Sequence, residues 1–224
     1  ARDMENHVLD SMDLEKEKGI TIKSHAIQME YKYKGETYLL NLIDTPGHVD
    51  FSYEVSRAIA SCEGALLLID ATQGVESQTM SNMYLAMEQD LTIVPVVNKI
   101  DLASADIESC KHQIDKELGL DSADAMMVSA KTGVGIDELM EAIVTKFPAP
   151  SGDPNGKPAA LIFDCHYDAY RGVIVHVRVM EGRFKTGDAI KMMSTNTQYK
   201  VEQCGIFKID YEETGVLEAG DVGY

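Results

Sequence analysis

The sequence predicts two domains, an α/β domain followed by a smaller β-rich domain. Over residues 1–147, short apolar runs alternate with segments of helical periodicity, a pattern typical of a doubly wound α/β domain with a mostly parallel sheet. Residues 148–158 are rich in Pro, Gly and Asn, as expected of a linker that contains several turns. From residue 159 to residue 224 the apolar period changes to two, which indicates the short strands of a small barrel or sandwich.

Four apolar runs are expected to form strands of the parallel sheet, because near-continuous apolar runs suit strands that are covered on both faces. They are residues 39–44, 65–70, 92–98 and 125–129. In an open α/β sheet, ligands bind outside the carboxyl ends of the strands. The residues that follow these four runs are therefore the first candidates for a functional site.

Three segments show the apolar spacing of helices. For the first we favour a core-facing stripe over a sticky methionine-rich surface; its residues are Met80, Met83, Tyr84 and Met87. The second carries Ile107, Cys110, Ile114 and Leu118 and ends at Gly119, the usual C-terminal residue of a helix. The third runs from Ile136 to Phe147.

The second domain is predicted to be a barrel. Its clearest strand runs from Val173 to Met180, where valines alternate with Ile174, His176, Arg178 and Met180. Lys185–Asp188 is expected to form a turn before the next strand. Residues 221–224 resemble the start of a further strand, so we expect the barrel to be incomplete at its C-terminal end.

Composition argues against some classes of function. The net charge is −17, from 37 acidic and 20 basic residues, so the chain is poorly supplied for neutralising nucleic-acid phosphates. The four cysteines form no Cys-x-x-Cys pair, so neither a disulfide framework nor a zinc site is expected. With no export signal and no apolar run of membrane-spanning length, a cytoplasmic protein is the expectation. A monomer is a separate expectation, which these observations do not test. The mixed charges of residues 15–18 are expected to face solvent.

The first motif is Asp44-Thr45-Pro46-Gly47-His48, directly after an expected strand. A carboxylate at Asp44 can hold Mg²⁺ through water, and Gly47 lets a backbone N–H approach a phosphate oxygen. His48 can orient a water for attack on a phosphoryl group. The alternative interpretation is an ordinary strand-to-loop turn with His48 on the surface.

The second motif is Asn98-Lys99-Ile100-Asp101, after the third strand. The Asp101 carboxylate can accept from the N1–H and the 2-amino group of guanine, whereas adenine lacks this pair of donors. Lys99 can lie over the base, and Asn98 can join neighbouring loops. A polar strand exit capped by Asp101 is the alternative.

The third motif is Ser129-Ala130-Lys131, after the fourth strand, where the Ala130 N–H can donate to the guanine O6. The tripeptide alone carries little information. Three such motifs in this order, each at a strand end, together predict a guanine-nucleotide site.

The three motifs resemble those of the translation-factor GTPase superfamily, a P-loop-NTPase-like fold followed by a β-barrel domain. Residues 18–22 also resemble the first switch region of that superfamily, although Lys18 stands where the family has Arg and lacks its planar fork. Within the superfamily, more specific stretches resemble the LepA family, also called elongation factor 4; they are residues 10–15, 51–57, 152–154 and 160–164. An elongation factor G-like GTPase is the alternative within the superfamily.

The resemblance implies roles for individual residues. Thr21 would bind Mg²⁺ together with Asp44, and Ile20 would form part of a hydrophobic gate beside the catalytic His48, with Gly47 sensing the γ-phosphate. The expected cofactors are GTP or GDP with Mg²⁺, and the expected partner is the ribosome. Peripheral membrane association is a further expectation from the resemblance alone.

The sequence departs from the superfamily at one motif. It contains no Gly-x-x-x-x-Gly-Lys-[Ser/Thr] phosphate loop, which in the superfamily precedes the first switch region together with the first strand. The resemblance implies that the chain starts just after this loop, as a fragment or as a sequence recorded without an N-terminal portion. Neighbours of the missing strand would then keep unpaired edges.

The sequence therefore predicts a translation factor that hydrolyses GTP on the ribosome. The alternative is that the 224-residue chain itself is a non-catalytic piece with a guanine half-site and a docking barrel. An ATP-using α/β enzyme is a third possibility, against which Asp101 argues.

Overall fold

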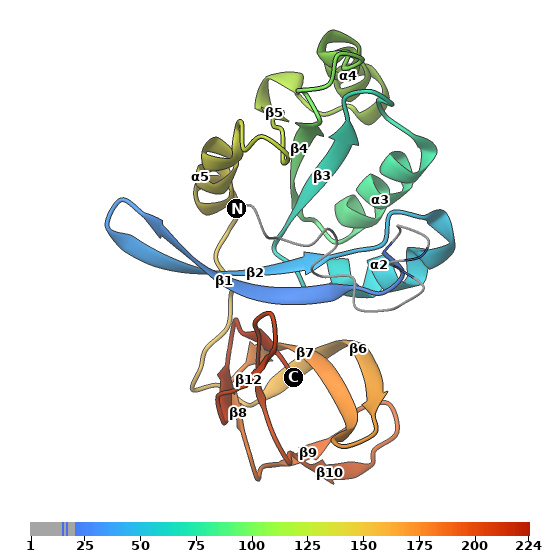
Figure 1. Cartoon of the computed structure of the whole chain (residues 1–224). Coiled ribbons are helices and arrows are strands. Elements are labelled where there is room, and N and C mark those ends of the chain that lie inside the picture. Colours follow the sequence, from blue (N-terminus) through green and yellow to red (C-terminus); the bar gives the residue numbers. More distant parts are fainter. Residues whose placement is uncertain (1–14, 16, 18–20) are drawn as a thin grey trace. The chain divides into compact units, whose positions relative to one another are not determined.

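The computed structural model describes Glu15, Glu17 and residues 21–224. They divide into two compact units. The α/β unit contains residues 33–36 and 46–149, and the barrel unit contains the described residues up to 32 together with 37–45 and 150–224. Figure 1 labels their elements.

A three-stranded parallel sheet in the order β3-β4-β5 forms the centre of the α/β unit. The elements of this unit are η1 (Val49–Phe51), α2 (Ser52–Ile59), β3 (Gly64–Asp70), α3 (Ser77–Glu88), β4 (Thr92–Asn98), α4 (Ile107–Gln113), η2 (Ile114–Leu118), η3 (Ser122–Asp124), β5 (Met126–Met127) and α5 (Ile136–Lys146). Strands and helices alternate along the chain, which confirms the predicted fold class.

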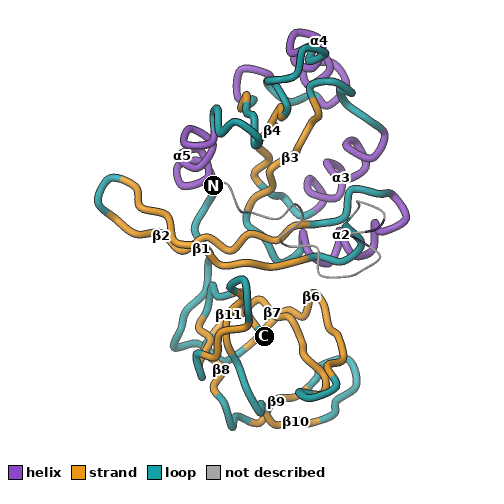
Figure 2. Tube along the Cα trace, in the orientation of Figure 1, coloured by secondary structure: helices purple, strands orange, loops and turns teal. Residues whose placement is uncertain are grey.

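Both faces of this sheet are covered, as the apolar runs predicted. On one face Ile69 and Val97 pack with Met83 of α3 and Ile114 of η2. On the other face Val96 packs with side chains of α5 and the residue after it, namely Ile136, Leu139 and Phe147. Figure 2 shows the helices around β3 and β4. Covering on two faces explains why β4 has four consecutive buried residues.

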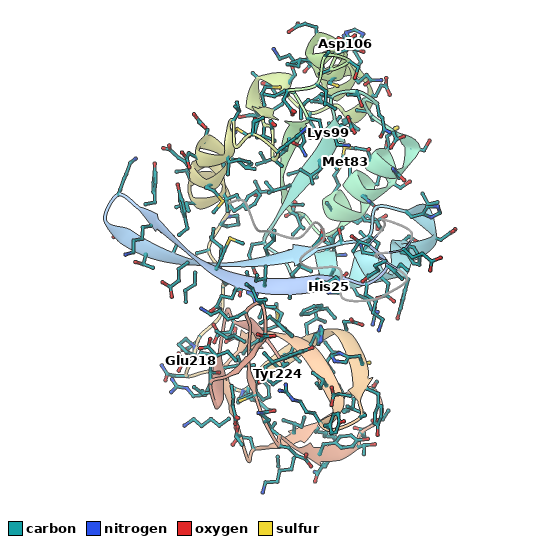
Figure 3. All side chains as sticks on the ribbon, in the orientation of Figure 1. His25, Met83, Lys99, Asp106, Glu218 and Tyr224 are labelled. Carbon is teal, nitrogen blue, oxygen red and sulfur yellow. The ribbon has the colours of Figure 1, made fainter. Side chains whose placement is uncertain are left out.

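The predicted core-facing stripe of α3 is wrong in part. Met83 is buried (labelled in Figure 3) and Met80 is partly buried, whereas Tyr84 and Met87 are 52% and 53% exposed. The other buried residues of the helix are Thr79 and Ala86. These small side chains take the helix positions that face the core, so the large residues beside them turn outward.

The run at residues 39–44 is not a strand of the parallel sheet, which corrects that prediction. It belongs to β2 (Glu36–Asp44), which pairs with β1 (His25–Tyr33) in a separate two-stranded sheet. The two-residue connection, Lys34 and Gly35, has φ angles of 49° and 88°. Positive φ at both positions produces the tight turn that matches the twist of a hairpin. Local turn chemistry thus gives β2 a neighbouring strand.

The barrel unit beyond the linker contains only strands and connecting segments. Its largest sheet has five strands in the order β12-β11-β14-β7-β6. The strands are β6 (Ala159–Asp168), β7 (Gly172–Glu181), β8 (Arg183–Lys185), β9 (Ala189–Lys191), β10 (Gln198–Lys200), β11 (Gly205–Phe207), β12 (Tyr211–Glu213), β13 (Val216–Glu218) and β14 (Val222–Gly223). The expected turn after β8 is present, with the Lys185 N–H donating to Asp188 Oδ2 at 2.8 Å.

The interior of the barrel unit is partly polar. On β7, every second residue from Ile174 to Arg178 is buried. Two of these three residues, His176 and Arg178, are polar. Phe163, Phe207 and Val222 form an adjoining apolar cluster, against which Ala26 of β1 and Ile43 of β2 pack. The hairpin base is therefore part of the same hydrophobic core as the strands of the barrel.

In the described part of the chain, residues 147–158 contain no helix or strand. No helix of that part combines the length and apolar character needed to cross a bilayer. None of the four cysteines, all within the described residues, forms a disulfide, and burial raises the pKa of the Cys110 thiol.

Candidate functional site

The carboxyl ends of β3, β4 and β5 lie side by side. Asp70 is paired in register with Asn98, and Val97 is paired with Met127. A backbone bond from the Ala71 N–H to the Asn98 oxygen, 2.9 Å, fixes the first of these alignments. The parallel arrangement therefore brings the loops after residues 70, 98 and 127 to one edge of the sheet.

Asp101 and Ser129 join two of these loops directly. The buried Ser129 hydroxyl donates to Asp101 Oδ1 at 2.7 Å, and its oxygen accepts from the Thr132 N–H at 3.1 Å. Asp101 itself is exposed. The bond therefore orients a solvent-facing carboxylate while leaving it room to accept further hydrogen bonds, since a carboxylate has about four lone-pair sites.

The loop after Ser129 depends on a glycine. Gly135 has φ 74°, and a Cβ there would lie 2.2 Å from the Met127 carbonyl oxygen. Only glycine tolerates both conditions. Its place next to the Ser129–Val134 bridge keeps the loop close to β5.

Asn98 joins the same loops through its side-chain oxygen. Asn98 Oδ1 accepts from the Lys99 N–H at 2.8 Å and from the Ala130 N–H at 3.1 Å. From the sequence we expect the Ala130 N–H to donate to the guanine O6. In the structure this N–H is already bonded to Asn98. A guanine O6 would have to share this donor or replace Asn98. Lys131, next along the loop, is exposed.

Lys99 reaches from the end of β4 to the end of β3 (labelled in Figure 3). Its backbone has φ 66°, and its Nζ lies 2.7 Å from Asp70 Oδ2. Asp70 Oδ1 accepts from the N–H and the hydroxyl of Thr72 at 2.8 and 2.7 Å. Burial alone would raise the pKa of Asp70, but the hydrogen bonds from Lys99 and Thr72 lower it below 3.8. Sequence reasoning did not include Asp70 or Thr72 in the site, although Asp70 ends an apolar run.

The loop with Gly47 and His48 leads into α2. Pro46 is buried, whereas Gly47 and His48 are exposed, and a Cβ at Gly47 would meet no atom within 4 Å. His48 Nδ1 accepts from the Asp50 N–H at 3.2 Å, which caps η1. His48 Nδ1 also lies 3.3 Å from Asp50 Oδ2. Because Asp50 faces Nδ1, Nε2 is the nitrogen left to contact a water.

The remaining predicted residues belong to the barrel unit. Both hairpin strands have nine residues and the turn has two, so His25 lies across from Asp44. Thr21 lies four residues before His25, the first residue of β1, and the half-buried Thr45 follows Asp44, the last residue of β2. Ile20 and Lys18 lie outside the described residues.

Glu15 corrects the prediction that residues 15–18 face solvent. It is fully buried, and its Oε1 accepts from the N–H groups of Ile22 and Lys23 at 2.9 and 3.0 Å. His25 Nε2 lies 3.5 Å from the same carboxylate. Because these N–H groups belong to the backbone, no side-chain pattern in the sequence indicated the burial of Glu15.

The predicted Mg²⁺ ligands, Thr21 and Asp44, provide one hydroxyl and one carboxylate. Among the residues that the structure describes, no group of three or more His, Cys, Asp or Glu is placed to hold a metal ion. Mg²⁺ usually keeps several waters and binds through one or two carboxylates together with substrate phosphates. The oxygen donors at Thr21 and Asp44 fit that manner of binding.

Comparisons with known proteins agree with the predicted resemblance. The chain is 63% identical to "Elongation factor 4" of Treponema denticola over 98% of its length, and 62% identical to the protein of the same name from Desulfosudis oleivorans over all of it. It spans 37 and 38% of the length of these two relatives. These matches confirm the resemblance to translation-factor GTPases and, among them, to elongation factor 4.

A solved structure of a protein from Thermus thermophilus has the same fold. It matches with a TM-score of 0.74 over 96% of this chain and 46% of its own, at 18% sequence identity. The family described as "Elongation factor Tu GTP binding domain" matches residues 1–149, most of the chain. The chain therefore belongs to the elongation factor Tu GTP-binding domain family.

Proposed function

We propose that the chain binds the guanine base of GTP or GDP and belongs to a translation factor of the elongation factor 4 type that hydrolyses GTP on the ribosome. Family membership and the names of the relatives support this proposal. The observation that carries it is the Asp101 carboxylate held by Ser129 at 2.7 Å. We infer a monomeric cytoplasmic protein with the ribosome as its partner.

The proposed recognition of guanine follows from hydrogen-bond chemistry. Asp101 would accept from the N1–H and the 2-amino group of guanine, while adenine would leave the carboxylate facing an acceptor. An unpaired buried polar group of this kind can give roughly 10⁴-fold discrimination. Lys99 would lie over the base, and Asn98, Ser129, Ala130 and Lys131 would form the loops around it.

The proposed hydrolysis rests on the loop after β2. Gly47 would place its N–H against the γ-phosphate, and Nε2 of His48 would orient the attacking water. The family resemblance assigns Ile20 to a hydrophobic gate. Phosphoryl transfer needs mainly positioning and charge stabilisation. Mg²⁺, held by Thr21 and Asp44, would supply positive charge to the phosphates. We propose residues 1–147 as the GTPase domain, 148–158 as the linker and 159–224 as the barrel domain.

A second candidate concerns the chain taken alone: it recognises the base without turnover. The supporting observation is that the bonds Asp101–Ser129 and Asn98–Ala130 join the loops after β4 and β5 through residues of these loops themselves. In this case the base-reading half of the site would form independently, and the barrel would serve as a docking module.

The substitution Asp101→Asn tests the base assignment. The amide can donate to the 2-oxygen of xanthine but cannot accept from both guanine donors, so preference should move from GDP to XDP. Fluorescent GDP and XDP titrations of the chain measure this shift. Asp90→Asn is the matched control, because Asp90 is exposed and has φ 56°, a conformation that Asn tolerates. Unchanged preference in Asp101→Asn would contradict the assigned pocket.

A further inference from the structure

Asp70 lies outside the three sequence motifs but is bonded to one of their residues. It ends β3 in register with Asn98, and its Oδ2 binds Lys99 Nζ at 2.7 Å. Its side chain is 17% exposed, whereas that of Lys99 is 54% exposed. The carboxylate is thus the more buried partner and the lysine the more exposed one.

Asp70 makes further contacts that do not involve Lys99. Thr72 donates twice to Asp70 Oδ1, from its N–H and its hydroxyl. The Asp70 carbonyl oxygen accepts from the Gly74 N–H at 2.8 Å. Thr72 therefore occupies one carboxylate oxygen and leaves the other directed to Lys99.

This bond affects the position of the whole lysine side chain. An unpaired lysine has four rotatable bonds and loses considerable side-chain entropy when a ligand immobilises it. Nζ is held at the end of β3, and the backbone of Lys99 follows the end of β4. The methylene stem therefore spans the edge of the sheet at which these two strands end. That edge is where the base is proposed to lie.

We propose that Asp70 is a positioning residue for guanine recognition, which acts by holding the Lys99 side chain in the conformation that covers the base. The inference rests on the proposed function of this pocket. It predicts that affinity for guanine nucleotide depends on Asp70 only while Lys99 carries its ammonium group.

A double-mutant cycle on the full chain tests this dependence. Asp70→Asn keeps the shape and the acceptor for Thr72 but removes the charge facing Lys99, and Lys99→Met keeps an apolar stem without the ammonium. Fluorescent GDP is titrated into the wild type, both single variants and the double variant, with Asp90→Asn as the control. Asp70→Asn should weaken binding about three- to tenfold, the cost of ordering one free side chain. In the Lys99→Met background the same substitution should change affinity less than about twofold.

Two outcomes of the cycle would overturn the proposal. Equal weakening by Asp70→Asn in both backgrounds would show a structural role that does not pass through Lys99. Tighter binding by Asp70→Asn would show that Asp70 competes with the nucleotide for Lys99.

NMR of the chain with ¹³C-labelled lysine separates this proposal from the proposed function. The Lys99 ε-methylene signal should move toward that of a free lysine in Asp70→Asn, with or without nucleotide. If the wild type fails to bind GDP, the proposed function fails, and this signal alone decides whether Asp70 holds Lys99. An unmoved signal would overturn the positioning role.

Discussion

The edge of the sheet in the α/β unit and the interior of the barrel unit both contain polar side chains, but they place them differently. At the sheet edge, Asp101 is exposed and accepts a hydrogen bond from the hydroxyl of the buried Ser129. In the barrel unit, His176 and Glu15 are themselves buried, at 8% and 0% exposure. An exposed, oriented polar group can meet a ligand, whereas a buried one contributes to folding. The comparison predicts that substitutions in the first region change function and those in the second change stability.

The largest effect is expected for His48→Ala in the full-length protein. Loss of the residue that orients the water should lower ribosome-stimulated GTP hydrolysis by about 10²–10³-fold, as for other groups that assist proton transfer or position a nucleophile. Affinity for GDP should remain within about twofold, because His48 is proposed to contact the water rather than the base. Single-turnover hydrolysis and GDP titration measure the two quantities.

His112→Ala is the control for this experiment, since His112 is an exposed histidine on α4. It should hydrolyse GTP at the wild-type rate. Undiminished hydrolysis in His48→Ala would remove His48 from the mechanism.

The next effect is a pH-dependent loss of stability caused by His176. Burial lowers the pKa of His176 from 6.5 to about 4, so the folded chain keeps it neutral. Between pH 6.5 and about 4 the unfolded chain takes up a proton that the folded chain does not. Stability should therefore be complete above pH 6.5 and fall by about 3 kcal/mol as the pH drops through 4.

Urea unfolding of the wild type and of His176→Phe over this pH range checks the prediction. Phe suits the site because His176 packs on the rings of Phe163 and Phe207, at centroid distances of 5.9 and 4.6 Å. The variant should show a shallower pH dependence. Identical pH slopes in the two proteins would show that His176 is not the group responsible.

A smaller loss of stability is expected for Glu15→Gln. The neutral amide can still accept from Ile22 and Lys23, but hydrogen bonds to an ionised group are stronger, so the free energy of unfolding should fall by about 1–2 kcal/mol. The exposed Glu17 provides the matched control, Glu17→Gln. If both variants unfold at the same urea concentration as the wild type, the charge of Glu15 adds nothing to the stability that its two backbone hydrogen bonds provide.

The same contrast explains what the sequence could and could not predict. Strands β3, β4 and β5 were predictable from their apolar runs. Burial on both faces explains the run in β4, where residues 94–97 are all buried, whereas Leu68 of β3 is 61% exposed. The hydrogen bond between Asp101 and Ser129 joins the second and third motifs, each of which follows a predicted strand. The pairing of β2 was not predicted, since its apolar run suits either sheet and the turn at Lys34 and Gly35 decides the outcome.

The barrel unit was harder to predict from its residues. On β7 the alternation of valines with Ile174, His176 and Arg178 is equally consistent with either face being buried, and the structure buries the face that contains the polar residues. The burial of Glu15 depends on backbone donors at Ile22 and Lys23. Asp70 became a site residue only when the register placed it beside Asn98. Contacts of this kind depend on tertiary structure, so they leave no mark in a local pattern.

The most direct test of the proposed function is a fluorescent-GDP titration of this chain, with Mg²⁺ present and excess ATP as competitor. We expect saturable binding that ATP does not displace and that Asp101→Asn abolishes, because the base is read by a carboxylate fixed at the ends of β4 and β5. Displacement by ATP, or no binding by a chain whose circular dichroism shows it folded, would contradict guanine recognition by this pocket.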